Sequence, residues 1–285
     1  MHAEAVEPAR QWVRASDGQM LAVYPEATGD GEPAWHVVFV HGFGGDAAAL
    51  TALGAALADE IRRAGLSAVI VRWDLRGHGH SSRRFPTDRT DLLAVLADDL
   101  ACVLTHVSPR RLLLVGHSLG GLVVQGYLGR PGVALPQATV LITPAIGLPR
   151  RAWLTGWWYR TLARGSVHRP VPAGQRTWAD HAGFVGGGDF DRHRLWSDAS
   201  RCGLISYGLI WLSLLAAEPP SLSVLDHESI SVIHGLQDAV IPVKACVAVR
   251  EALSRATVLQ WPCNHNPVLS QPGSCATYLA GRLSR

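Results

Sequence analysis

Short apolar runs that alternate with helix-like segments are the feature that most limits how this chain can fold. Continuous apolar runs bounded by glycine, proline or polar residues occur at 35–42, 67–77, 111–116, 138–144, 229–235 and 256–261, after a first strand-like segment at 20–27. Such runs are typical of strands buried on both faces of a parallel sheet. Segments with helical character lie between and after them, at 48–65, 90–107, 122–129, 244–253 and 275–283. The order predicts an α/β protein with a mostly parallel, doubly wound sheet.

The alternation is interrupted between residues 147 and 222. This segment contains many Trp, Arg, Gly and Pro residues, and its two ends, 151–163 and 204–217, have helical character. The glycine-rich stretch 181–190 is typical of a flexible connector. The simplest division is therefore a core formed by 1–146 and 223–285, with a helical cap at 147–222 inserted after the strand predicted at 138–144. A chain of 285 residues is long enough for this arrangement.

Composition excludes several classes of protein. Hydrophobic residues make up 48% of the chain and charged residues 17%, as in a globular protein, and the net charge of +3 is too small to indicate a nucleic-acid partner. The N-terminus does not resemble a signal peptide, and the longest apolar stretch, 204–217, is too short for a membrane span. The five cysteines have no CxxC spacing. We expect a cytoplasmic protein with reduced thiols and no bound metal.

The segment 111–128, "RLLLVGHSLGGLVVQGYL", places one serine between a predicted strand and a predicted helix. A strand that turns sharply into a helix passes through a strained backbone conformation, and small neighbours allow the two elements to approach each other. Gly116 and Gly120 flank Ser118 at the required spacing. The first N–H groups of a helix favour a negative charge at that point. We therefore expect Ser118 to be a nucleophile and the backbone N–H of Leu119 to be an oxyanion donor.

Four further motifs accompany the serine segment, namely "VHGFGG" (40–45), "DLRGHGHS" (74–81), "HGLQDAVIP" (234–242) and "WPCNHNPVLSQP" (261–272). In this order, the set resembles the α/β-hydrolase superfamily. The resemblance implies that Phe43 supplies a second oxyanion N–H, Asp238 is the triad acid and His265 is the base. It also implies that a serine nucleophile distinguishes the chain from the dehalogenases and epoxide hydrolases of that superfamily. The chain departs from the family at Cys263, where a glycine is usual.

The chain offers other candidates for the acid and the base. Asp226 is the rival acid, but it precedes a strand and would lie at the wrong edge of the sheet. His41 and His117 lie within glycine motifs and are expected to shape loops. His78 and His80 are expected to be surface turn residues, with lining of the site as the alternative. Asp74 is expected to brace its loop.

Six tryptophans fall within 147–222, at positions 153, 157, 158, 178, 196 and 211. They predict a broad aromatic surface over the site for a hydrophobic or aromatic substrate, although each could instead pack the cap onto the core. The candidate substrate-binding residues are Trp153, Trp157, Trp158, Trp211 and Tyr207. The cap arginines could attract an anionic substrate, but a solvated face is the simpler interpretation.

The predicted activity is hydrolysis of a carboxylic ester, a small-molecule substrate, through an acyl-enzyme on Ser118, without a cofactor. Thioester cleavage or acyl transfer on the same triad is the first alternative. A hydrolase of C–C bonds and a non-catalytic ligand receptor with the same fold are further alternatives. The sequence leaves open whether two copies of the chain pair as a homodimer.

Overall fold

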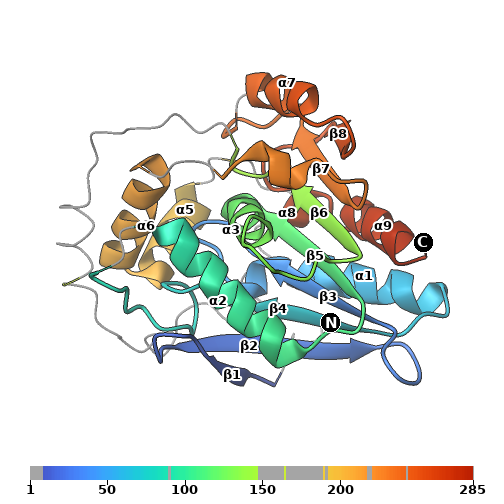
Figure 1. Cartoon of the computed structure of the whole chain (residues 1–285), viewed down its shortest axis with the longest axis horizontal. Helices are drawn as coiled ribbons and strands as arrows, with labels where there is room; N and C mark the ends of the chain where they lie inside the picture. The colour runs from blue at the N-terminus through green and yellow to red at the C-terminus, as the bar shows by residue number, and fades with distance from the viewer. Residues whose placement is uncertain are drawn as a thin grey trace.

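The structure is a computed structural model that describes residues 9–88, 91–146, 164, 189, 192–216, 220–241 and 243–284. Eight strands form one sheet in the order β1-β2-β4-β3-β5-β6-β7-β8 (Figure 1). Their bounds are β1 Gln11–Arg14, β2 Met20–Thr28, β3 Trp35–Val40, β4 Ala68–Trp73, β5 Leu112–His117, β6 Ala138–Ile142, β7 Ile230–Gly235 and β8 Thr257–Trp261.

The sheet is mostly parallel, as the sequence predicts. Strands β4, β3, β5, β6, β7 and β8 pair in parallel, whereas β1 pairs with β2 and β2 pairs with β4 in antiparallel fashion. Strands β3, β5, β6 and β7 lie inside the sheet and are almost entirely buried, which explains their continuous apolar sequences. Strand β1 was not predicted because only Val13 is buried within it, so it has no apolar run to detect.

Helices cover both faces of the sheet. Their bounds are η1 Ala47–Leu50, α1 Thr51–Arg63, α2 Leu92–Val107, α3 Leu119–Leu128, α5 Arg192–Cys202, α6 Leu204–Ala216, η3 Leu222–Leu225, α7 Val243–Ala252, α8 Pro267–Ser270 and α9 Pro272–Leu283. Helices α1 and α9 pack with one face of the strands through a core that includes Leu57 and Leu279. Helices α2 and α3 cross the other face, where Leu96 and Val123 belong to a second core (Figure 1). The two separate cores are the physical basis of the doubly wound architecture.

The ends of α2 follow from local hydrogen bonding. The side chain of Asp91 accepts a hydrogen bond from the backbone N–H of Ala94, which caps the first turn. At the other end, Ser108 has a positive φ of 47°, and its N–H donates to the carbonyl of Leu104. Residue 90, which was expected to share the start of this helix, lies outside the described residues.

Helices α5 and α6 belong to the segment that was predicted to form the cap. They lie at the left of Figure 1, beyond the ends of α2 and α3. Helix α6 matches the helix expected at 204–217. Helix α5 was not predicted, because its sequence "RHRLWSDASRC" is mostly polar and has no long apolar stripe. The helix expected at 151–163 lies entirely outside the described residues. Among the described helices, none combines the length and the apolar character needed to cross a membrane.

Candidate active site

Ser118 lies at the junction between β5 and α3. Its φ of 51° is in the left-handed region, which a non-glycine residue rarely adopts. The junction is also too close for larger neighbours, since a Cβ on Gly120 would lie 2.1 Å from the carbonyl oxygen of Val40. A Cβ on Gly116 would lie 2.6 Å from the carbonyl oxygen of Gly120. The two glycines therefore permit the strained turn that holds the serine at the carboxyl edge of the sheet.

The structure brings the three predicted catalytic side chains together. His265 Nε2 lies 2.8 Å from Ser118 Oγ, and His265 Nδ1 lies 2.8 Å from Asp238 Oδ2. Ser118 and His265 are 9% and 6% exposed, so water has little access to the hydrogen bond between them. The three residues follow the separate strands β5, β7 and β8, whose carboxyl ends meet at one edge of the sheet.

Asp238 is held as an ionised carboxylate. Its Oδ1 accepts hydrogen bonds from the backbone N–H groups of Val240 at 2.8 Å and Ile241 at 2.7 Å, which leaves Oδ2 for His265. Burial raises the pKa of Asp238, but the hydrogen bond and charge of His265 and the two N–H groups outweigh burial and lower this pKa below its usual value. An ionised acid at this position fixes the imidazole with its proton on Nδ1.

The rival acid, Asp226, does not reach the site. It follows η3 and precedes β7, where its carboxylate accepts hydrogen bonds from the backbone N–H of Arg255 and the hydroxyl of Ser254. Its role in the structure is therefore to join two loops at the opposite edge of the sheet.

The backbone of His265 is fixed from two sides. Its carbonyl oxygen lies 2.8 Å from the donating hydroxyl of Thr143 and 2.9 Å from Nε2 of His117. Its N–H donates to Oδ1 of Asp189 at 2.8 Å. Sequence reasoning missed Thr143 and Asp189. Thr143 directly follows β6 and could have been noticed at the carboxyl edge, but nothing in the local sequence of Asp189 indicates this contact.

Cys263, at the position where a glycine is usual, fits its loop without strain. Its N–H donates to the carbonyl of Trp261 at 2.8 Å, and its carbonyl accepts from the N–H of Gln237 at 3.0 Å. Among the described non-glycine residues, positive φ occurs at Ser108, Ser118 and Thr143 and not at Cys263. Burial raises the pKa of the Cys263 thiol to about 11, so this sulfur stays protonated beside the site.

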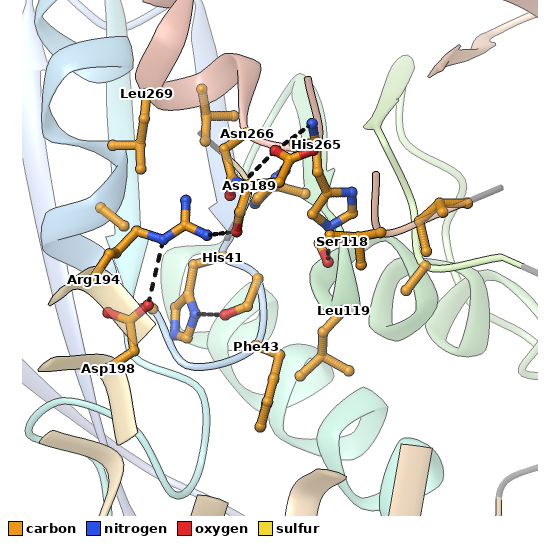
Figure 2. A pocket seen from close by; sticks show the side chains of 18 of the residues that line it. His41, Phe43, Ser118, Leu119, Asp189, Arg194, Asp198, His265, Asn266 and Leu269 are labelled. Atoms are coloured by element: carbon orange, nitrogen blue, oxygen red, sulfur yellow. Dashed lines mark hydrogen bonds and ion pairs between the residues drawn. The ribbon is translucent and has the colours of Figure 1, made fainter. Parts of the chain in front are cut away.

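The two residues predicted as oxyanion donors both line the pocket next to Ser118. Phe43 and Leu119 lie on the same side of Ser118 in Figure 2. Leu119 is the first residue of α3, so its N–H has no acceptor within the helix. Among the described residues, none accepts a hydrogen bond from the N–H of Phe43.

Buried polar side chains support the loop that carries Phe43. The N–H of Gly44 donates to Nε2 of His78 at 3.2 Å, and the N–H of Ala47 donates to Oδ1 of Asp74 at 2.8 Å. The expected bracing role of Asp74 thus agrees with its contacts. The expectation that His78 is a surface residue is wrong, because its side chain is fully buried. The neighbouring glycines concealed this burial, since a polar, glycine-rich sequence is usually exposed.

His78 provides a test of this support through stability. Burial, together with the nearby ring of His41, lowers the pKa of His78 to about 3, against roughly 6.5 in the unfolded chain. The unfolded state then binds a proton at His78 that the folded state does not bind. The free energy of unfolding is therefore at its full value above about pH 6.5 and decreases as the pH falls toward the folded pKa. We expect His78→Gln, whose Oε1 can still accept from Gly44, to reduce the acid slope of the unfolding free energy by about 1.4 kcal/mol per pH unit between pH 6 and 4. Denaturant unfolding at several pH values measures this slope, and an unchanged slope would contradict the buried neutral imidazole.

Ser118 and His265 line a cavity of about 220 Å³, whereas Asp238 lies behind His265 and does not line it. One part of its lining comes from the core beneath α2 and α3, including Leu119, Ala145 and Ile241. Another part, including Leu50 and Leu269, belongs to the core beneath α1 and α9. The cavity therefore straddles the edge of the sheet, with Ser118 between two apolar surfaces.

Helices α5 and α6 complete the lining. The Tyr207 ring lies 4.3 Å from the Phe43 ring between centroids, and the Trp211 ring stacks on Phe43 at 5.7 Å. Two of the five predicted substrate-binding residues thus line the cavity, whereas Trp153, Trp157 and Trp158 lie outside the described residues. Arg194 also lines the cavity and forms an ion pair with Asp198 at 3.9 Å (Figure 2). Within the described part of the chain, no group of His, Cys, Asp and Glu side chains is placed to hold a metal ion.

Comparison with known proteins identifies the family of this arrangement. Residues 37–277 match the family model described as "Alpha/beta hydrolase family". The chain is 30% identical over 171 residues to "Probable oxidoreductase EphD" of Mycobacterium tuberculosis, a match that covers 56% of this chain but 27% of that protein. The chain therefore spans about a quarter of the length of this curated relative.

Two further similar proteins are named as esterases. A "Putative esterase/lipase" of Haemophilus influenzae is 32% identical over 85 residues, covering 30% of this chain and 26% of that protein. The solved structure of an esterase from Exiguobacterium antarcticum superposes with a TM-score of 0.68 at 16% identity, covering 97% of this chain and all of the other. At this identity, the superposition establishes the shared fold alone.

Proposed function

The chain belongs to the alpha/beta hydrolase family, and on that basis we propose that it is a serine hydrolase that cleaves carboxylic esters. One observation carries the proposal. Asp238, His265 and Ser118 form a continuous hydrogen-bonded chain, with 2.8 Å in each step between side chains, and the chain ends in an apolar cavity. The relative named as a putative esterase/lipase supports an ester as the substrate.

The geometry suits acylation of the serine. With its proton on Nδ1 and directed at Asp238, His265 has a lone pair on Nε2 that accepts the Ser118 proton while Oγ attacks the acyl carbon. The carbonyl oxygen gains the electron pair, and the N–H groups of Phe43 and Leu119 stabilise the negative charge. When the C–O bond to the leaving alcohol breaks, His265 returns the proton to that alcohol oxygen. The acyl group then remains on Ser118.

Deacylation uses the same groups with water. His265 takes one proton from a water molecule, whose oxygen attacks the acyl carbon. The bond to Ser118 Oγ breaks, Oγ recovers the proton from His265, and the carboxylic acid leaves. These steps consume one ester and one water and require no cofactor.

The lining favours a neutral ester with a hydrophobic or aromatic part. Tyr207, Trp211 and Phe43 form one aromatic wall of the cavity. The one arginine among the described lining residues, Arg194, is accompanied by Asp189 and Asp198, so the described lining offers no excess of positive charge for an anionic substrate. We assign 147–222 as a cap over the cavity. Helices α5 and α6 belong to this segment and contribute Arg194, Asp198, Tyr207 and Trp211 to the lining.

Labelling with a fluorophosphonate tests the nucleophile, and a substrate panel tests the reaction. We expect stoichiometric modification of the peptide that contains Ser118, and faster turnover of aromatic and medium-chain p-nitrophenyl esters than of the acetate. Thioesters and added alcohols belong in the same panel. Faster cleavage of thioesters would indicate a thioesterase, and transfer of the acyl group to the added alcohol would indicate an acyltransferase. Modification of a different serine would contradict the assignment. A protein that is neither labelled nor active on any ester would instead be a ligand receptor.

A further inference from the structure

Asp189 is a buried carboxylate that the proposed chemistry does not use. It belongs to the segment predicted as the cap, and it is 7% exposed. Its two oxygens accept three hydrogen bonds from N–H donors. Oδ1 accepts from the backbone of His265 at 2.8 Å and from the side-chain amide of Asn266 at 3.3 Å, and Oδ2 accepts from the backbone of Ala239 at 3.0 Å.

These three donors belong to the two loops that carry the acid and the base. Ala239 directly follows Asp238, and His265 is the base itself. One carboxylate from the cap segment therefore joins the loop after β7 to the loop after β8. In Figure 2, Asp189 lies between His265 and Arg194, and Arg194 Nη2 donates to the Asp189 carbonyl oxygen at 2.7 Å. Asp189 is thus fixed through its backbone as well as through its side chain.

The contact of Asp189 complements the contacts that the core makes with His265. Thr143 and His117 hold the carbonyl oxygen of His265 from the core side. Asp189 holds the N–H of the same residue from the cap side. Without Asp189, the N–H of His265 would lose its acceptor, and the contacts of the carbonyl oxygen and of the imidazole would remain.

We propose that Asp189 is a positioning residue that aligns Asp238 and His265 through its hydrogen bonds to the backbone N–H groups of Ala239 and His265. The proposal rests on the proposed function, since it concerns the same triad. It gives the cap a role in assembling the catalytic groups, in addition to lining the cavity. Misplacement of catalytic groups by about 1 Å can reduce turnover by about a hundredfold.

Asparagine at position 189 is a diagnostic replacement. Both carboxylate oxygens of Asp189 face N–H donors, so the amide group of an isosteric asparagine must direct its NH₂ at one of them in either orientation. Volume and shape are retained while the alignment is disturbed. Alanine is the second variant. It removes both acceptor oxygens but places no NH₂ group against a backbone N–H, and water can then solvate the N–H groups.

The matched control is Asp226→Asn. Asp226 is also a loop carboxylate that accepts hydrogen bonds from a backbone N–H and a side chain of a neighbouring loop, but it lies away from the triad. Full-length wild-type protein and the three variants are compared by thermal unfolding, by kcat and KM for a p-nitrophenyl ester well below the melting temperature, and by the downfield proton NMR signal of the His265 Nδ1–H bound to Asp238.

We expect both Asp189 variants to lose about 10- to 100-fold in kcat with KM within about twofold of wild type, and to lose or broaden the downfield signal. Asp226→Asn is expected to keep kcat and the signal. Folded Asp189 variants with wild-type kcat and signal would overturn the positioning role. Failure of both Asp189 variants to fold, while Asp226→Asn folds, would also overturn it, because Asp189 would then support the whole fold. A wild-type protein without any hydrolysis refutes the proposed function instead, and the NMR comparison still decides the role of Asp189.

Discussion

Ser118→Ala lowers kcat for a short p-nitrophenyl ester by about 10⁶-fold, the scale known from other serine triads. The hydroxyl of Ser118 is the group within 2.8 Å of His265 Nε2, so its removal leaves the base without a nucleophile to activate. Initial rates at saturating ester, with the fluorophosphonate label as a second readout, measure the loss. The cavity and the oxyanion N–H groups remain, so KM is expected to change little.

The backbone at position 118 provides a control for this experiment. Ser118 has a φ of 51°, a conformation that strains alanine but suits glycine. Ser118→Gly should therefore be more stable than Ser118→Ala by about 1 kcal/mol, while both variants lose activity to the same extent. An equal loss of activity in two variants of unequal stability would show that the missing hydroxyl, and not the backbone strain, causes the loss. If either variant retains activity near that of wild type, Ser118 is not the nucleophile.

Asp238→Asn lowers kcat by about 10⁴-fold, although the substitution is isosteric. The reason lies in Oδ1 of Asp238, which accepts hydrogen bonds from the backbone N–H groups of Val240 and Ile241. The asparagine carbonyl must take that place, so its NH₂ faces His265 Nδ1. Nδ1 then has to accept a hydrogen bond, and the proton moves to Nε2, where it faces Ser118 and prevents general-base catalysis.

The expected signature of Asp238→Asn is a low kcat in a protein that still folds and still binds substrate. Steady-state kinetics and thermal unfolding measure the two properties, and Asp226→Asn again serves as the matched carboxylate control. Activity within tenfold of wild type would remove Asp238 from the triad. An equal loss in Asp226→Asn would indicate that loop stability, and not the tautomer of His265, limits the reaction.

Local patterns in the sequence were sufficient to predict much of the fold. The apolar runs at β3, β5, β6 and β7 were detectable because burial on both faces requires continuous apolar sequence. Ser118 was predicted from its strand–helix segment, and Asp238 and His265 from the resemblance of their motifs to the α/β-hydrolase superfamily. The structure joins these three side chains by hydrogen bonds. Strand β1 and helix α5 were missed, since neither has an apolar pattern of its own.

The tertiary structure alone decided how those residues are held. The contact between Asp189 and His265 joins positions 76 residues apart, and the contact between Thr143 and His265 joins positions 122 apart. The burial of His78 likewise depends on the loop that carries Gly44, 34 residues earlier. A sequence records which side chains can donate or accept a hydrogen bond, but the partner is selected when the sheet edge brings distant loops together. For this reason the sequence could supply candidates for the reacting groups, whereas the contacts that support these side chains became visible only in three dimensions.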